Sequence, residues 1–163
     1  MTELSGRESS DRLTAAACWV VRIALSAAFL SAVSDRFGLW GPPGSAGVSW
    51  GSVANYETYV AKLNWFLPRS LVPVVGWLAT VAEVSLAFGL IVGWRLRWVA
   101  LAAGLLLATF ATAMAFALGP KSPLDYSVPS AVGAALLLAA VSPTGAERRA
   151  EKALSVSANK TEE

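Results

Sequence analysis

The sequence of 163 residues contains no histidine and a single cysteine, Cys18. Without histidine, the chain lacks the usual protein ligand of haem, the commonest ligand of transition metals and the side chain best suited to acid–base catalysis near neutral pH. One cysteine forms neither an internal disulfide nor a Cys-x-x-Cys dithiol. We therefore expect no metal site, no covalently held cofactor and no thiol–disulfide exchange by this chain alone.

Charge is also scarce in this sequence. Only 15% of the residues are charged and 55% are hydrophobic, whereas soluble domains carry about 25% charged residues. The net charge is +2 and the basic residues form no stripe, so nothing indicates a nucleic-acid partner. The length suits one domain. These properties favour a single domain that is embedded in a membrane and surrounded by lipid.

Apolar segments occupy most of the chain between two polar ends. A helix needs roughly 20 residues to cross the hydrocarbon core. Four segments approach that length, and we predict spans over residues 13–34, 73–93, 97–118 and 124–142. The polar ends, residues 1–12 and 143–163, are expected to be tails. The predicted fold is thus all-α, a membrane-embedded four-helix bundle over residues 13–142.

The orientation of the predicted bundle follows from its basic residues. With four spans, both termini and the short loop at Arg95 and Arg97 share one side, which carries eight Lys and Arg residues against four opposite. Cytoplasmic loops are enriched in these residues, so we expect both termini in the cytoplasm. A competing interpretation treats residues 1–34 as a secretory signal cleaved after "AVS". We favour the span, because the basic region of such a signal would be unusually long.

The long loop between the first two spans carries a helical pattern of its own. It begins with the turn-forming run "DRFGLWGPPGSAG". Apolar residues then recur every three or four positions, at Trp50, Val53, Tyr56, Val60, Leu63 and Leu67. Trp and Tyr are frequent at membrane–water interfaces, so we predict a short interfacial helix over residues 50–67. It forms either part of an aromatic belt or, alternatively, a lid over a lateral ligand entrance.

Two ionisable residues interrupt the apolar spans, Arg22 in the first and Glu83 in the second. At about 1.5 Å per residue, Arg22 lies roughly 14 Å from the inner end of its span and Glu83 roughly 15 Å. We therefore predict a buried Arg22–Glu83 ion pair. Pairing would offset the cost of an isolated charge at the bilayer centre, on the order of 3 kcal/mol. The pair either fixes the register of two helices or anchors a ligand or relays protons.

Further polar residues lie toward the outer ends of the first and fourth spans. Asp35 and Arg36 close one span, and Asp125 and Tyr126 open the other. Pro129 lacks an N–H group, so it should kink or delay the fourth helix. Irregular backbone at membrane depth is tolerated against protein or a wet cavity. These four polar residues therefore join the predicted pair as candidates for ligand binding or proton relay, in a funnel from the outer surface. The alternative is ordinary charge near lipid headgroups.

Three runs of residues, in this order, resemble the DoxX-like family of bacterial four-helix membrane proteins. They are "DRFGLWG" after a first span with an internal Arg, "VGWLATVAEVSLAFGLIVGWRLR" and "GPKSPLDYSVPSAVGAALLLA". The resemblance covers roughly residues 15–142 and places Arg22, Asp35, Arg36, Glu83 and the "LDYS" residues on polar positions of the family. It implies a location in the bacterial inner membrane. Some members are linked to thiosulfate oxidation that delivers electrons to quinone, and others accompany oxidoreductases.

The expected function is therefore an accessory or quinone-interacting subunit of a membrane oxidoreductase. Its expected partners are lipids, a catalytic subunit and further copies of the chain. The alternative is a non-catalytic scaffold in which the ion pair is structural, and a small transporter is less favoured because no inverted repeat occurs. The sequence contains no P-loop, dinucleotide fingerprint or nucleophile elbow. No catalytic residue is assigned, and whether the protein is an enzyme stays open.

Overall fold

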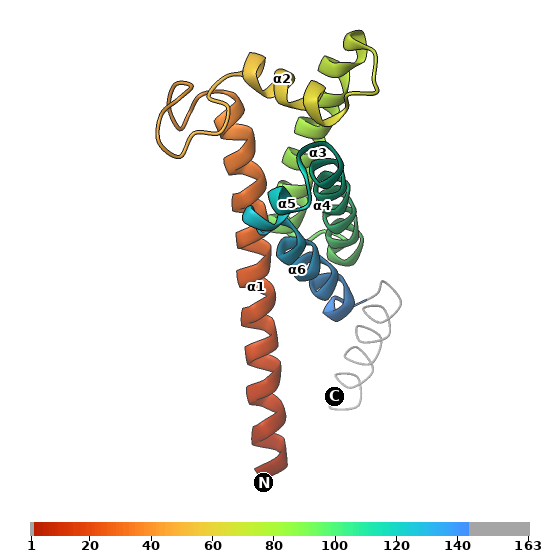
Figure 1. Ribbon diagram of the computed structural model, residues 1–163. Helices are drawn as coiled ribbons and strands as arrows, with labels where there is room; N and C mark the ends of the chain where they lie inside the picture. Colours follow the sequence, from red (N-terminus) through yellow and green to blue (C-terminus); the bar gives the residue numbers. More distant parts are fainter. Residues whose placement is uncertain (1, 144–163) are drawn as a thin grey trace.

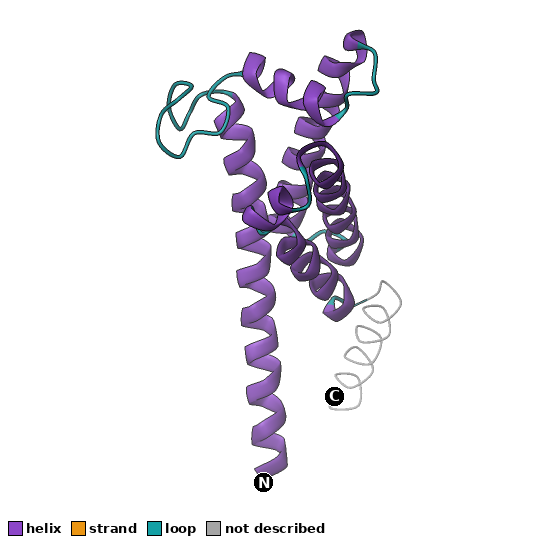
Figure 2. Ribbon diagram, in the orientation of Figure 1, coloured by secondary structure: helices purple, strands orange, loops and turns teal. Residues whose placement is uncertain are grey.

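The computed structural model describes residues 2–143, which form helices joined by loops, without a strand among them (Figure 1, Figure 2). Three segments are long and apolar enough to cross a membrane. They are Ser9–Arg36 of helix α1 (Thr2–Arg36), Arg69–Val92, which joins the short η1 (Arg69–Leu71) to α3 (Val72–Val92), and α4 (Leu96–Leu118). Large apolar side chains stay exposed along all three, including Ile23, Leu78 and Leu105. Such outward apolar faces suit lipid contact, and the three helices support the prediction of a membrane protein.

Small side chains form the contacts between these helices. Ala87, Ala100, Ala103 and Ala135 are completely buried, which lets the helix backbones approach closely, as in other membrane proteins. Gly104 contributes in the same way, because a Cβ atom there would lie 3.3 Å from the Leu136 side chain. The core they share with Leu25, Phe29, Leu90 and Leu138 draws on α1, α3, α4 and α6 (Val128–Val141).

The fourth predicted span is divided. We expected one helix over residues 124–142, but the structure has α5 (Lys121–Asp125) and then α6, separated by Tyr126 and Ser127. Ser127 has a positive φ of 54°, which no continuous right-handed helix allows. Pro129 lies in the first turn of α6, where its missing N–H is harmless, so the predicted delay is observed. The 14 residues of α6 extend roughly 21 Å, less than a hydrocarbon core of about 30 Å.

The ends of the helical part also differ from the expectation. Residues 2–12, predicted as a polar tail, continue α1, which projects beyond the other helices at its N-terminal end (Figure 1). The predicted tail over residues 143–163 lies outside the described part of the chain, apart from its first residue. Helix α2 (Val53–Leu63) occupies the middle of the range predicted for a helix in the outer loop. It lies crosswise over the ends of α1 and α3 (Figure 1); its place at a membrane interface stays a prediction.

Candidate functional site

The buried ion pair of the structure joins Arg36, the last residue of α1, to Glu83 in the middle of α3. The Arg36 Nη2 atom lies 2.7 Å from both carboxylate oxygens of Glu83 and donates its hydrogen bond to Oε1. The two residues are 3% and 1% exposed. Burying a charge this completely costs several kcal/mol of lost hydration unless an opposite charge compensates it. Each of the two residues therefore requires the other.

Thr80 completes the contacts of Arg36 with α3. Its hydroxyl accepts a 2.6 Å hydrogen bond from Arg36 Nη1 and donates one of 2.9 Å to the Gly76 carbonyl. Arg36 Nε and Glu83 Oε2 have no hydrogen-bond partner among residues 2–143. Buried polar atoms are nearly always hydrogen-bonded. The Nε–H group of Arg36 is therefore a buried donor that the described residues leave without an acceptor.

Aromatic rings from the loop between α1 and α2, and from α2 itself, cover the guanidinium group. Arg36 Cζ lies 4.0 Å from the centroid of the Tyr56 ring and 5.5 Å from that of Trp50, within the range of cation–π attraction. The Tyr56 hydroxyl donates a long hydrogen bond of 3.4 Å to the Gly76 carbonyl. A Cβ atom on Gly76 would lie 3.3 Å from Tyr56 Cε1, so glycine permits this approach. Burial raises the pKa of Tyr56 above its ordinary value, although the Arg36 charge opposes the shift.

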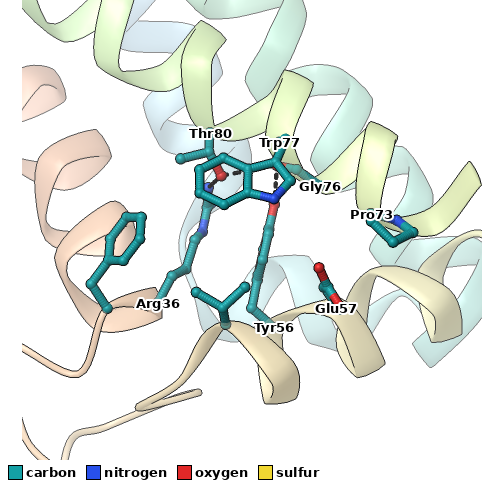
Figure 3. A pocket seen from close by; sticks show the side chains of 9 residues that line it. Arg36, Tyr56, Glu57, Pro73, Gly76, Trp77 and Thr80 are labelled. Atoms are coloured by element: carbon teal, nitrogen blue, oxygen red, sulfur yellow. Dashed lines mark hydrogen bonds between the residues drawn. The ribbon is translucent and has the colours of Figure 1, made fainter.

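A small pocket opens between the end of α1, helix α2 and the first turns of α3 (Figure 3). Arg36 and Tyr56 extend into it toward Thr80. Phe37 and Trp77 form an apolar wall, and both are half exposed. The enclosed volume is only about 10 Å³, room for about one water molecule.

An open apolar face of α3 adjoins this pocket. Val74, Leu78 and Val81 form it, and it shares Pro73 and Trp77 with the pocket. All five residues belong to one helix, so this face is a surface and not an enclosed cavity. Ligand sites are mostly apolar with a few polar groups that fix orientation. The pocket and the adjoining apolar face therefore suit a ligand with a small polar head and an apolar tail that lies along α3.

Asp35 holds the loop over residues 37–52 against the end of α1. Its carboxylate accepts three hydrogen bonds, from the backbone N–H groups of Ser49, Trp50 and Gly51, at 2.8, 3.2 and 3.2 Å. The positive φ of Gly51, 64°, turns the backbone inward, and a Cβ atom there would lie 2.6 Å from the Pro43 nitrogen. Asp35 thus places Trp50 over Arg36. We had expected the Asp35 side chain to line a funnel.

The predicted Arg22–Glu83 pair is wrong. Arg22 donates 2.7 Å hydrogen bonds from Nε to the Leu90 carbonyl and from Nη2 to the Ile91 carbonyl. These groups belong to the last turn of α3, where carbonyls lack partners within the helix and the helix dipole favours a cation. The Trp19 ring stacks against the guanidinium at 3.8 Å. Arg22 therefore caps α3 and takes no part in the pocket.

The error lies in the helix register, because the depth count assumed that the first span starts at Leu13. The structure instead aligns Ser26 with Ala87, whose carbonyl accepts a 3.0 Å bond from the serine hydroxyl. Arg22 consequently reaches the end of α3, seven residues beyond Glu83 and roughly 10 Å away along the helix axis. Glu83 lies nearer the C-terminal end of α1, where the long side chain of Arg36 reaches it.

Asp125 and Tyr126 do not join the buried pair. Asp125 accepts a 2.6 Å hydrogen bond from Lys121 on the same short helix, and both side chains are exposed. Tyr126 is also exposed. Of the six predicted site residues, the structure brings together only Arg36 and Glu83. The predicted funnel is not formed by these side chains.

The sequence interpretation missed Thr80, Gly76 and Tyr56. A signal for the first two exists, because Gly76, Thr80, Glu83 and Ala87 follow at spacings of four and three on one helical face. A polar and a small residue on the face of a buried carboxylate indicate a packed polar contact. The sequence around Tyr56 shows only an amphipathic helix, so its contact with Arg36 depends on how α2 folds over α3.

Comparisons with protein-family models, with curated proteins and with solved structures give no match. Residues 2–143 contain no group of three side chains able to hold a metal ion. The chemistry of the site must therefore be judged from its own residues, namely a compensated buried cation, its Nε–H group without an acceptor among the described residues, and an adjoining apolar face of α3.

Proposed function

We propose that the protein binds the polar head of a lipid-soluble ligand of the quinone class between α1, α2 and α3. The observation that carries the proposal is the buried Arg36, whose Nε–H group has no partner among the described residues and which lines the pocket. A quinone carbonyl is an acceptor for such a donor, and the apolar face of α3 at Val74, Leu78 and Val81 suits an apolar tail. The resemblance to the DoxX-like family supports the same ligand class.

In this proposal the protein is an accessory subunit of an inner-membrane oxidoreductase that uses quinone, and it supplies a binding site rather than a catalytic group. The orientation with both termini in the cytoplasm, the interfacial position of α2 and the crossing of the membrane by α6 belong to the proposal. So do a partner subunit and association with further copies of the chain. The lysine and arginine distribution supports the orientation.

Mass spectrometry of the purified protein tests this function. We expect wild-type protein to retain quinone close to one per chain. The variant Arg36→Gln/Glu83→Gln removes both charges together, so neither is left buried without its partner; it should fold and lose the quinone. Arg22→Gln is the matched control, because it alters the other end of the α1–α3 contact, and it should retain quinone. Quinone-free wild-type protein, or a double variant that keeps its quinone, would contradict the proposal.

A second function is favoured by a different observation, the size of the network. Arg36, Glu83 and Thr80 connect α1 to α3, while Asp35 holds the loop, and the enclosed volume is only about 10 Å³. Buried ion pairs can specify how helices assemble. The protein would then be a scaffold in which the pair is structural. Arg36→Glu/Glu83→Arg should in that case restore the function that either single change removes.

A further inference from the structure

The charge of Arg36 is already compensated before any ligand arrives. Its Nη2 atom lies 2.7 Å from the Glu83 carboxylate, and both side chains are buried. An anionic head entering the pocket would meet a neutral pair instead of a free cation. The Nη1 atom donates to Thr80 and the Nη2 atom to Glu83, so Nε is the guanidinium nitrogen that has no acceptor among the described residues. One uncharged oxygen acceptor satisfies it.

Glu57 adds a negative charge to the same pocket. It lies on α2, is half-buried and lines the pocket beside Tyr56 and Pro73 (Figure 3). Within residues 2–143 it forms neither an ion pair nor a side-chain hydrogen bond. The basic residues nearest in sequence, Lys62 and Arg69, are not among the residues that line the pocket. The lining therefore carries an uncompensated carboxylate, which repels a second anion at short range.

We infer that the pocket admits uncharged oxygen-bearing heads and excludes anionic ones, and that Glu57 is the residue that sets this specificity. This inference rests on the proposed ligand site but not on the ligand being a quinone. Most lipids of an anionic membrane surface would be kept out, whereas a ketone, ester or quinone carbonyl can accept from Arg36 Nε.

Two probes with the same tail test this inference, decan-2-one and decyl sulfate, each added at matched membrane mole fractions. Protein containing 5-fluorotryptophan in zwitterionic nanodiscs reports binding through the ¹⁹F signal of Trp77, assigned with Trp77→Phe. In wild-type protein we expect decan-2-one to shift this signal saturably and decyl sulfate to have no effect. In Glu57→Gln we expect decyl sulfate to bind at least about tenfold more tightly, about 1.4 kcal/mol, with decan-2-one unchanged.

Asp11→Asn is the control, since it removes one negative charge from the opposite end of α1 and should leave decyl sulfate excluded. Equal binding of both probes to wild-type protein, binding of neither, or exclusion that persists in Glu57→Gln would overturn the inference. Displacement of decan-2-one by a decyl-tailed quinone supports both proposals. Displacement by dioleoylglycerol alone supports the charge selection and removes quinone from the proposed function.

Discussion

Arg36 and Glu83 meet at 2.7 Å because the side chain at the end of α1 reaches back along α3. The pair lies under Tyr56 and beside Thr80, so it connects the helix interface to the pocket. At the other end of the same interface, Arg22 caps α3. Two arginines of one helix thus perform separate tasks, one with a carboxylate and one with backbone carbonyls.

Removing one member of the ion pair should be costly, whereas replacing both should not. Glu83→Ala leaves the Arg36 guanidinium buried without its counter-charge, and we expect a loss of about 3–5 kcal/mol in the free energy of unfolding. Arg36→Met/Glu83→Leu should be neutral or stabilising, because a well-packed apolar pair needs no compensation. Unfolding in detergent micelles measures both. A double variant as unstable as Glu83→Ala would show that the contact is not a simple pair.

Double-mutant cycles should show that Glu83 interacts with Arg36, as observed, and not with Arg22, as the depth count predicted. The effects of mutating two residues in direct contact differ from their sum by about 0.5–3 kcal/mol, whereas the effects at distant residues add within about 0.5 kcal/mol. We expect coupling between Arg36→Gln and Glu83→Gln in the free energy of unfolding, and additivity between Arg22→Gln and Glu83→Gln. Coupling between Arg22 and Glu83, with additivity between Arg36 and Glu83, would instead support the pair predicted from depth.

Gly93 should tolerate no side chain. Its φ of 75° is strained for other residues, and a Cβ atom would lie 2.6 Å from Arg22 Nη2. Gly93→Ala should therefore destabilise the protein by more than about 1 kcal/mol, measured by thermal unfolding. Gly133→Ala is the control, since it lies within α6 with nothing near its Cβ position. We expect it to stabilise by about 0.5–1 kcal/mol; equal effects at both sites would contradict the proposed role of Gly93.

The loop over residues 37–52 should open when Asp35 is lost. Asp35→Ala removes the acceptor of three backbone N–H groups, so amides 49–51 should exchange with deuterium much faster. Each unmet donor costs about 1–3 kcal/mol when buried. Asp35→Asn keeps one acceptor oxygen and should give an intermediate rate. Unchanged exchange at these amides in Asp35→Ala would show that the loop is held elsewhere.

Stability should fall in alkaline solution through Tyr56. Burial raises the pKa of its hydroxyl above the ordinary value of 10.0 in the folded protein. The folded state therefore binds more protons than the unfolded state above pH of about 10, and the free energy of unfolding decreases as pH rises through that range. Burial also raises the pKa of Tyr59, so Tyr56→Phe should weaken the decline without abolishing it. Unfolding measured from pH 8 to 11, with tyrosinate absorbance, tests this; an identical decline in Tyr56→Phe would contradict it.

The sequence by itself determined the helices and their environment. Hydropathy located three apolar helices, the period of three and four located α2, and Pro129 located the delayed start of α6. It also identified Arg22 and Glu83 as residues needing an explanation, because an isolated charge in an apolar segment is costly whatever surrounds it. Arg36 was one of the further polar candidates at the end of the first span. Each of these properties depends on the local composition of one segment.

Only the tertiary structure decided which charges meet. The register of α1 against α3 comes from small residues packed across several helices and from the turn at Gly93, which places the last carbonyls of α3 beside Arg22. A long arginine side chain then reaches a partner more than one turn from its own level. A count of residues along each span takes account of neither the register between the helices nor the length of the arginine side chain. It therefore paired Glu83 with Arg22, whereas packing joins Glu83 to Arg36.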